Sequence, residues 1–282
     1  MADYRDLPHV RGELLQIRPG RRLSVAYQAG GDSVVFFGHG GGGNKDQWRE
    51  LWRELGRRGY SLVAWDLLGH GASDRPNDPR AYAWNELVAD ELEVLRRFGG
   101  QRNVIVAHSF GTGLALSALL AGPAVKIEAA LLLGSQLHRP LKRKGLLNLP
   151  VWVLEFFRPR LARGFRQAAW HPKADPALVA YEDGLAQGNS LRVFKALVAH
   201  ARWPDSVALT RLEVPIAVVA GDRDGLTPAQ GGEELARQLP QATFRVLENC
   251  GHQLMLEKPG EVLEAFEGLL ARVDLLEPVQ RV

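Results

Sequence analysis

Strand-like and helix-like segments alternate along most of the sequence, and this order restricts the possible folds more than any other feature. The short apolar runs at residues 34–37 and 104–107 are each followed by a helix-forming run, at residues 46–58 and 110–121. Continuously apolar runs of this length are typical of strands that are buried on both faces. The alternation therefore predicts an α/β fold with a mostly parallel, doubly wound sheet that helices cover on both faces.

The predicted elements reach both ends of the chain. Strands are expected at residues 14–17, 23–27, 34–37, 61–65, 104–107, 129–133, 216–220 and 243–247. The first two flank Pro19-Gly20 and are predicted to pair as a hairpin. Helices are expected at residues 46–58, 84–98, 110–121, 231–239 and 259–273, and a frayed tail at residues 277–282.

Residues 136–210 interrupt this alternation between the sixth and seventh predicted strands. Helix-like stretches occur within them at residues 151–157, 176–187 and 191–201, without a convincing strand. An insertion at this point is expected to lie over the carboxyl edge of the sheet, where ligands bind in such folds. We therefore predict an α/β core of residues 1–135 and 211–282 with a helical lid of residues 136–210 inserted after the sixth strand.

Composition excludes several classes of protein. The single cysteine, Cys250, excludes an intramolecular disulfide and a cysteine-based zinc site. The polar N-terminus shows no secretory signal, and no apolar run approaches the roughly 20 residues that cross a bilayer. We expect a soluble, cytoplasmic protein.

The segment Ala107-His108-Ser109-Phe110-Gly111 lies between a predicted strand and a predicted helix. A nucleophile at such a strand–turn–helix elbow takes strained backbone angles, so the residues two positions away must be small. Ala107 and Gly111 meet this requirement, although glycine is more usual at the first position. The alternative, a serine that only caps the helix, is disfavoured by the position of the motif in the α/β order.

A serine hydroxyl needs a base, and the base needs an acid to orient it. Of the eight histidines, only His252 lies in a loop after the last predicted strand. Asp222 and Asp224 both follow the predicted strand at residues 216–220, and either could be the acid. The order Ser, Asp, His is the one expected of an α/β hydrolase.

Together these segments resemble the α/β-hydrolase-fold serine hydrolases. The matching motifs are His39-Gly40-Gly41, Asp66-Leu67-Leu68-Gly69-His70-Gly71-Ala72-Ser73, the elbow at Ser109, Asp224 four residues before Pro228, and Gly251-His252 followed by Glu257-Lys258-Pro259. Within that superfamily the chain is most similar to α/β-hydrolase domain-containing protein 8 and its relatives. That closer match is carried by Arg18-Pro19-Gly20-Arg21, Asn148-Leu149-Pro150 with Val153-Leu154, and Trp203-Pro204.

The resemblance implies a role for each motif. Ser109 would be the nucleophile, His252 the general base, and Asp224 the acid, because the family places the acid four residues before a proline. The backbone N–H groups of Phe110 and of Gly41, in the glycine-rich loop after residues 34–37, would bind the oxyanion. We expect no metal and no cofactor.

Three further histidines, His39, His70 and His108, lie in the matching motifs. We expect them to be structural rather than catalytic, with His39 bracing the oxyanion loop.

The net charge of +3 conceals an uneven distribution. Residues 139–173, here called the basic segment, hold nine basic residues and one acid, Glu155, which gives +8 against −5 for the rest of the chain. The basic residues are Arg139, Lys142, Arg143, Lys144, Arg158, Arg160, Arg163, Arg166 and Lys173. Aromatic side chains lie between them, and we expect Trp152, Phe156 and Phe157 to contact substrate.

Two interpretations of the basic segment stay open. Its apolar side packs on the core while the arginines are solvated, or it contacts an anionic membrane or an anionic substrate such as acyl-CoA. The second would place the protein at the inner face of a membrane. Nucleic acid is disfavoured because no binding motif accompanies the charge.

The sequence thus predicts a serine esterase, lipase-like, that cleaves carboxylic esters or thioesters with a hydrophobic acyl chain through an acyl-enzyme. Two alternatives remain: a hydrolase of C–C bonds in a diketone, and a non-catalytic binding protein of the same fold. The sequence predicts no oligomeric state.

Overall fold

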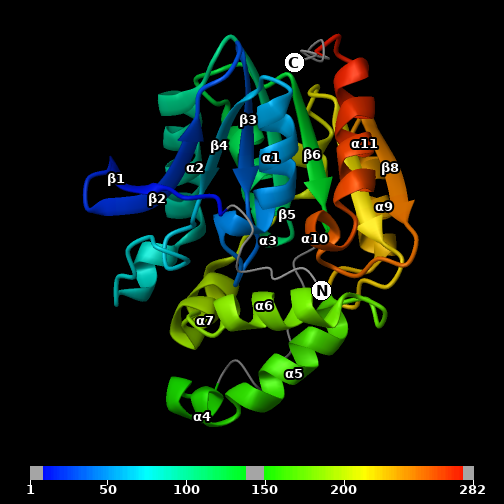
Figure 1. Ribbon diagram of the computed structural model, residues 1–282. Helices are drawn as coiled ribbons and strands as arrows, with labels where there is room; N and C mark the ends of the chain where they lie inside the picture. The colour runs from blue at the N-terminus through cyan, green and yellow to red at the C-terminus, as the bar shows by residue number, and fades with distance from the viewer. Residues whose placement is uncertain (1–8, 138–148, 276–282) are drawn as a thin grey trace.

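The computed structural model, which describes residues 9–137 and 149–275, contains one eight-stranded sheet with helices on both faces (Figure 1). The strands are β1 (Glu13–Arg18), β2 (Arg21–Gln28), β3 (Ser33–Gly38), β4 (Ser61–Trp65), β5 (Arg102–His108), β6 (Ala129–Leu133), β7 (Ile216–Gly221) and β8 (Ala242–Leu247). Their order in space is β1-β2-β4-β3-β5-β6-β7-β8. The predicted strands are all present, and the mostly parallel sheet is confirmed.

The two antiparallel pairs lie together at one edge of the sheet. β1 and β2 form the predicted hairpin, and β2 also pairs antiparallel with β4. From β4 onward every neighbouring pair is parallel. The carboxyl ends of these parallel strands therefore meet at one edge, where their loops can bring distant residues together.

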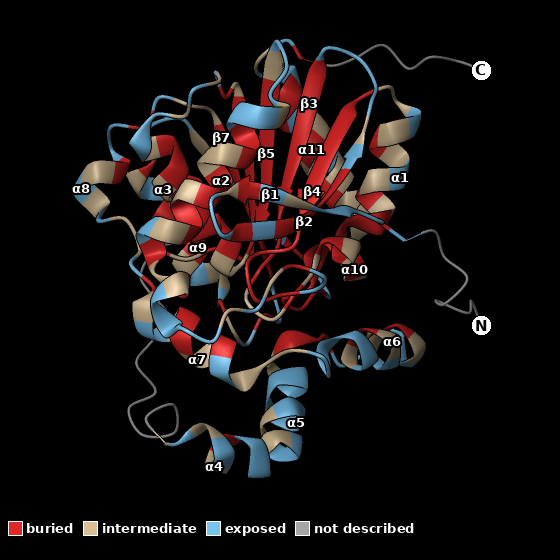
Figure 2. Ribbon diagram, turned by 90° about the vertical axis from the view of Figure 1, so that its left-hand side faces the viewer, coloured by how far each residue is buried: buried red, intermediate tan, exposed pale blue. Residues whose placement is uncertain are grey.

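Helices on the two faces of the sheet enclose two separate apolar cores. These helices are α1 (Arg49–Arg57), α2 (Trp84–Phe98), α3 (Phe110–Ala121), α9 (Ala229–Gln238), α10 (Leu254–Glu257) and α11 (Pro259–Ala271). Alternate residues of β3 enter different cores: Phe36 packs in the one shared by α2, α3 and α9, and Phe37 in the one shared by α1 and α11. Figure 2 shows the strands buried from both sides, as continuous apolar runs require.

The first predicted helix differs at its start. Residues 45–48 form a 3₁₀ turn (Lys45–Trp48), and α1 begins at Arg49. The side chain of Asn44 accepts the N–H of Asp46, which caps the turn. A second 3₁₀ turn, Pro79–Tyr82, precedes α2.

Between β6 and β7 the described residues form five helices: α4 (Val151–Phe156), α5 (Arg158–Ala169), α6 (Pro176–Ala186), α7 (Leu191–His200) and α8 (Ser206–Leu209). The helices expected near α4, α6 and α7 are present. α5 was not expected, because its arginines and Gly164 hide the apolar repeat that marks a helix.

That residues 136–210 form a separate lid domain stays a prediction. Part of the basic segment lies outside the described residues: Arg139, Lys142, Arg143, Lys144 and Asn148. The expected tail at residues 277–282 also lies outside them. None of the helices in the described ranges combines the length and the apolarity that a membrane span requires.

Glu91 of α2 is a buried acid whose titration should show in the stability of the fold. It is 2% exposed, and burial raises the pKa of its carboxyl group from 4.5 to about 8. A raised pKa in the folded state gives stability that is complete below pH 4.5 and is lost as the pH rises through about 8. At about 1.4 kcal/mol per pH unit, the wild type should lose about 4 kcal/mol of unfolding free energy between about pH 5 and about pH 8.5.

The variant Glu91→Gln should remove this loss, because an amide does not ionise. Urea unfolding of both proteins at pH 5 and pH 8.5 measures it. Glu93→Gln on the same helix is the matched control, because a hydrogen bond from Arg96 lowers the pKa of Glu93 instead. An equal pH dependence in wild type and Glu91→Gln would contradict the assignment.

Candidate active site

Ser109 lies at the junction of β5 and α3, at the carboxyl edge of the sheet. Its backbone has φ 52° and ψ −121°, a conformation that is strained for any residue other than glycine. The turn requires glycine around it: a Cβ on Gly40 would lie 2.8 Å from the Cβ of Ser109, and one on Gly111 would lie 2.6 Å from the carbonyl oxygen of His39. The structure thus forms the strand–turn–helix elbow that the sequence motif predicts.

A continuous chain of hydrogen bonds joins Ser109, His252 and Asp224. The Nε2 atom of His252 lies 2.9 Å from the Oγ of Ser109, and its Nδ1 atom lies 2.7 Å from Oδ2 of Asp224. Asp224 and His252 are buried, while Ser109 is half-buried. Because the carboxylate can only accept, Nδ1 carries the proton and Nε2 is free to accept the hydroxyl hydrogen of Ser109.

Both carboxylate oxygens of Asp224 accept hydrogen bonds from its own loop. Oδ1 accepts the N–H groups of Leu226 and Thr227, each at 2.8 Å, and Oδ2 accepts the hydroxyl of Thr227 at 2.7 Å. Burial opposes its ionisation, but the electrostatic interaction with His252 and the hydrogen bonds from His252 and Thr227 together lower its pKa. Asp224 is therefore an oriented carboxylate. Thr227 was missed in the sequence, although a threonine three residues after an aspartate is a turn signal.

The competing acid, Asp222, does not reach His252 by any described contact. Its Oδ1 accepts the N–H of Cys250 at 2.9 Å, so it ties the loop after β7 to the loop after β8. The structure thus brings Asp224, and not Asp222, to the imidazole.

The glycine-rich loop after β3 lies against the elbow. A Cβ on Gly41 would lie 3.7 Å from the Cβ of Phe110, the first residue of α3. Among the described hydrogen bonds, none uses the N–H of Gly41 or of Phe110. The N–H groups at a helix start lack partners within the helix and carry its positive dipole end. The two predicted oxyanion donors are therefore neighbours beside Ser109.

Two buried histidines hold this loop in place. The N–H of Leu67 donates to Nε2 of His39, so Nδ1 of His39 donates to the carbonyl of Gly40 at 2.7 Å. Nε2 of His70 accepts the N–H of Gly42 at 3.0 Å. Burial lowers the pKa of both rings, that of His70 to about 3, so they are neutral at neutral pH.

His108 supports the other side of the site. Its Nε2 atom donates to the carbonyl oxygen of His252 at 2.8 Å, and burial lowers its pKa to about 3. His39 was expected to brace the oxyanion loop, and its hydrogen bond to the carbonyl of Gly40 is a contact of that kind. Neither His70 nor His108 has a described bond to Ser109.

The C-terminal end of α5 joins the loops that carry Asp224 and His252. The carbonyl of Ala168 accepts the N–H of Gly225 at 2.9 Å, and the carbonyl of Ala169 accepts the N–H of His252 at 2.7 Å. The helical segment between β6 and β7 is thus part of the framework that holds the site.

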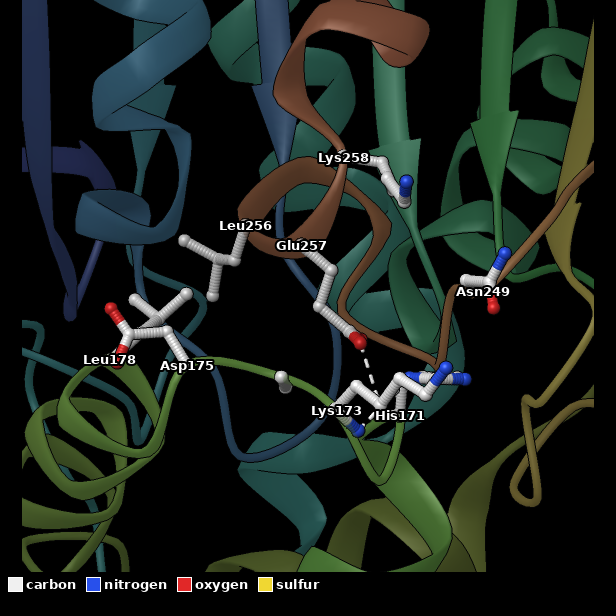
Figure 3. A pocket seen from close by; sticks show the side chains of 9 residues that line it. His171, Lys173, Asp175, Leu178, Asn249, Leu256, Glu257 and Lys258 are labelled. Atoms are coloured by element: carbon white, nitrogen blue, oxygen red, sulfur yellow. Dashed lines mark hydrogen bonds between the residues drawn. The ribbon is translucent and has the colours of Figure 1, made fainter.

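Glu257 strengthens this junction, a role that the sequence motif did not reveal. Its Oε2 atom accepts the N–H of His171 at 2.9 Å and of Gly251 at 3.1 Å. Figure 3 shows Glu257 directed at His171 beside a cavity of about 360 Å³. Lys173, Asp175 and Lys258 also line this cavity, so its charges are balanced.

No described contact joins Ser109 to the three aromatic residues that are expected to contact substrate. Trp152 and Phe156 are 74% and 78% exposed, and Phe157 is 37% exposed. Their role as substrate contacts stays a prediction. The helical segment instead places Phe194 of α7 at the oxyanion loop, 3.9 Å from a Cβ on Gly41.

Other aromatic rings extend the apolar surroundings of the nucleophile. The ring of Phe110 contacts those of Trp84 and Trp203, with centroids 5.3 and 5.8 Å apart. Within residues 9–137 and 149–275, no group of three or more histidine, cysteine or acidic side chains is arranged to hold a metal ion.

Comparison with known proteins agrees with the fold. Residues 34–265 match the alpha/beta hydrolase family. Protein ABHD8 of Bos taurus is 30% identical over 263 residues, which cover 92% of this chain and 60% of that protein. The chain therefore spans about 60% of the length of the curated relatives of that name.

Other similar proteins are shorter. A 2-hydroxymuconate semialdehyde hydrolase of Pseudomonas putida is 28% identical over 229 residues, which cover 76% of this chain and 78% of that one. The crystal structure of a putative aryl esterase from Burkholderia cenocepacia has a TM-score of 0.81 at 19% identity, over 93% of this chain and 99% of that one. At this level of identity the likeness is one of fold.

Proposed function

This chain belongs to the alpha/beta hydrolase family, and from that premise we propose that it is a serine hydrolase of carboxylic acyl esters or thioesters. The observation that carries the proposal is the hydrogen-bonded chain from Ser109 through His252 to Asp224. This geometry lets a serine hydroxyl lose its proton as it attacks a carbonyl carbon.

In the first half of the reaction the Oγ of Ser109 attacks the acyl carbon, and its proton passes to Nε2 of His252. Asp224 stabilises the imidazolium that forms, because its Oδ2 accepts the Nδ1 hydrogen. The N–H groups of Gly41 and Phe110 bind the negative oxygen of the tetrahedral intermediate. Its collapse breaks the bond to the alcohol or thiol, which leaves with the proton from His252.

In the second half a water molecule gives a proton to His252 and attacks the acyl-serine. The carboxylic acid is released as Ser109 regains its proton. The reaction is complete with these side chains and water.

The surroundings of Ser109 support a hydrophobic acyl chain. Phe110, Trp84 and Trp203 form one aromatic cluster, and Phe194 of α7 reaches the oxyanion loop. Apolar side chains of this kind bind alkyl or aryl groups in hydrolase pockets.

The relative from Pseudomonas putida favours one second candidate, a hydrolase of C–C bonds in a diketone. The same nucleophile and oxyanion donors serve both reactions. The two differ in substrate, so a series of p-nitrophenyl esters of increasing chain length, assayed beside a diketone that releases a carboxylic acid, separates them.

A fluorophosphonate probe tests the proposal itself, because it reacts with an activated serine. We expect labelling of the wild type and of Ser117→Ala, a matched change within α3, and no labelling of Ser109→Ala. Labelling that does not depend on Ser109, or no labelling of the wild type, would favour a non-catalytic protein of this fold.

A further inference from the structure

We propose that α4 and α5 form a surface that docks on membranes containing anionic lipid. The surface consists of four aromatic and four basic side chains and is called the α4–α5 surface. They are Trp152, Phe156, Phe157, Phe165, Arg158, Arg160, Arg163 and Arg166. The proposal goes beyond the hydrolase activity and does not depend on it.

The two helices project from the molecule. Figure 1 shows α4 and α5 at the end remote from most of the sheet, and Figure 2 shows their surface as largely exposed. In α5, residues 162–167 are all exposed, although an amphipathic helix on a core usually buries one face. This helix therefore offers most of its circumference to another partner.

Four exposed aromatic side chains lie on or between two consecutive helices, α4 and α5. Trp152, Phe156, Phe157 and Phe165 are 74%, 78%, 37% and 43% exposed. They make up four of the nine large apolar side chains that are exposed in the described ranges. A local concentration of this kind marks an interaction site rather than the ordinary exposure of single residues.

α4 separates its apolar side chains between two faces. Leu154 is 1% exposed and points inward, whereas Trp152 and Phe156, four residues apart, share an outward face. The base of the helix pair is held in place, because Arg158 donates to the carbonyl of Asn189 and Lys195 donates to that of Leu149. The outward aromatics are thus not required to fill the core.

The charge of the surface is complementary to anionic lipid. Residues 151–169 hold four arginines and one acid. Arg158 pairs with Glu155 and Arg166 with Asp183, while no ion pair in the described part of the chain involves Arg160 or Arg163. Tryptophan and phenylalanine enter the lipid interface while arginine remains with the headgroups.

The same features disfavour other occupants. A second copy of this chain would bring two basic surfaces together. A soluble anion would need an enclosed site, but neither of the two described cavities is lined by these residues.

Docking would also orient the proposed active site. The parallel strands point their carboxyl ends toward the helical segment (Figure 1), and the C-terminal end of α5 is hydrogen-bonded to the loops that carry Asp224 and His252. The site would therefore face the membrane side of the molecule, as access to lipid-dissolved acyl esters requires. This consequence alone rests on the proposed function.

Vesicle binding tests the proposal. We expect the wild type to sediment with vesicles of equal parts phosphatidylcholine and phosphatidylglycerol, and to bind vesicles of phosphatidylcholine alone much more weakly. Arg160→Glu/Arg163→Glu should weaken binding to the anionic vesicles at least about tenfold, since each basic residue near such a surface adds to the attraction and each glutamate adds repulsion. Trp152→Ser/Phe156→Ser should lose the binding that remains at high salt, when charge is screened.

The matched control is Arg11→Glu/Arg211→Glu, which makes the same change of charge at two exposed arginines outside the α4–α5 surface. It should bind like the wild type, and unfolding temperatures of all variants should agree. Equal binding by wild type and both surface variants would overturn the proposal. Two other results would also overturn the proposal, if vesicle binding is unchanged in the surface variants. One is that these variants abolish self-association of the wild type, and the other is that they abolish saturable binding of a soluble acyl-CoA.

Discussion

Ser109→Ala should lower the kcat for a cleavable ester by about 10⁶-fold. The variant keeps the imidazole and the oxyanion donors but has no oxygen to form the acyl-enzyme. Because serine and histidine act as one unit, the double variant Ser109→Ala/His252→Ala should be no slower than the single one. The rates of the single and double variants are compared in single-turnover experiments with a p-nitrophenyl ester. The purified proteins must first be shown to be folded.

Substrate binding provides the control for this prediction. The alanine side chain fits the strained elbow at least as well as serine, so the dissociation constant of the uncleaved ester should change little. A double variant that is a further 10-fold or more slower than the single one, about 1.4 kcal/mol, would show that the two side chains act independently. That outcome would contradict the triad.

Asp224→Asn should lower kcat by about 10⁴-fold. The N–H groups of Leu226 and Thr227 both donate to Oδ1, so the carbonyl oxygen of the new amide must occupy that position. Its NH₂ group then faces Nδ1 of His252, which must accept instead of donate. The proton moves to Nε2, and the imidazole can no longer take the hydrogen of Ser109.

Asp222→Asn is the matched control, since it makes the same change two residues away. Its oxygen can still accept the N–H of Cys250, and it has no described contact with His252. We expect kcat within a few-fold of the wild type. A larger loss in Asp222→Asn than in Asp224→Asn would reverse the assignment of the acid.

Much of the framework could be predicted from the sequence because it is set by local pattern. The bounds of β4, β6, α2 and α3 are those expected from the apolar runs and from the glycines or polar residues that end them. α5 was missed because arginine-rich residues do not show which side of a helix is covered. The 3₁₀ turn before α1 was missed because it depends on a single cap at Asn44.

The supporting residues of the site were harder to predict. Glu257 and Phe194 each lie against a partner on another element: His171 for Glu257 and Gly41 for Phe194. The residues near them in the sequence do not indicate which partner they contact. Ser109 and His252 were identified because the elbow and the last loop carry signals of their own.

Periodicity and loop composition were enough to predict the α/β order, the elbow at Ser109 and the chemistry available at the ends of β7 and β8. They depend only on neighbours in the chain. The resemblance favoured Asp224 over Asp222, but the contact itself depends on the tertiary structure, because Ser109 and His252 are 143 residues apart. The loop after β7 turns Asp224 toward His252 and Asp222 toward the N–H of Cys250. The outward face of Trp152 and Phe156 was likewise decided by what α4 packs against, and no helical repeat can specify that.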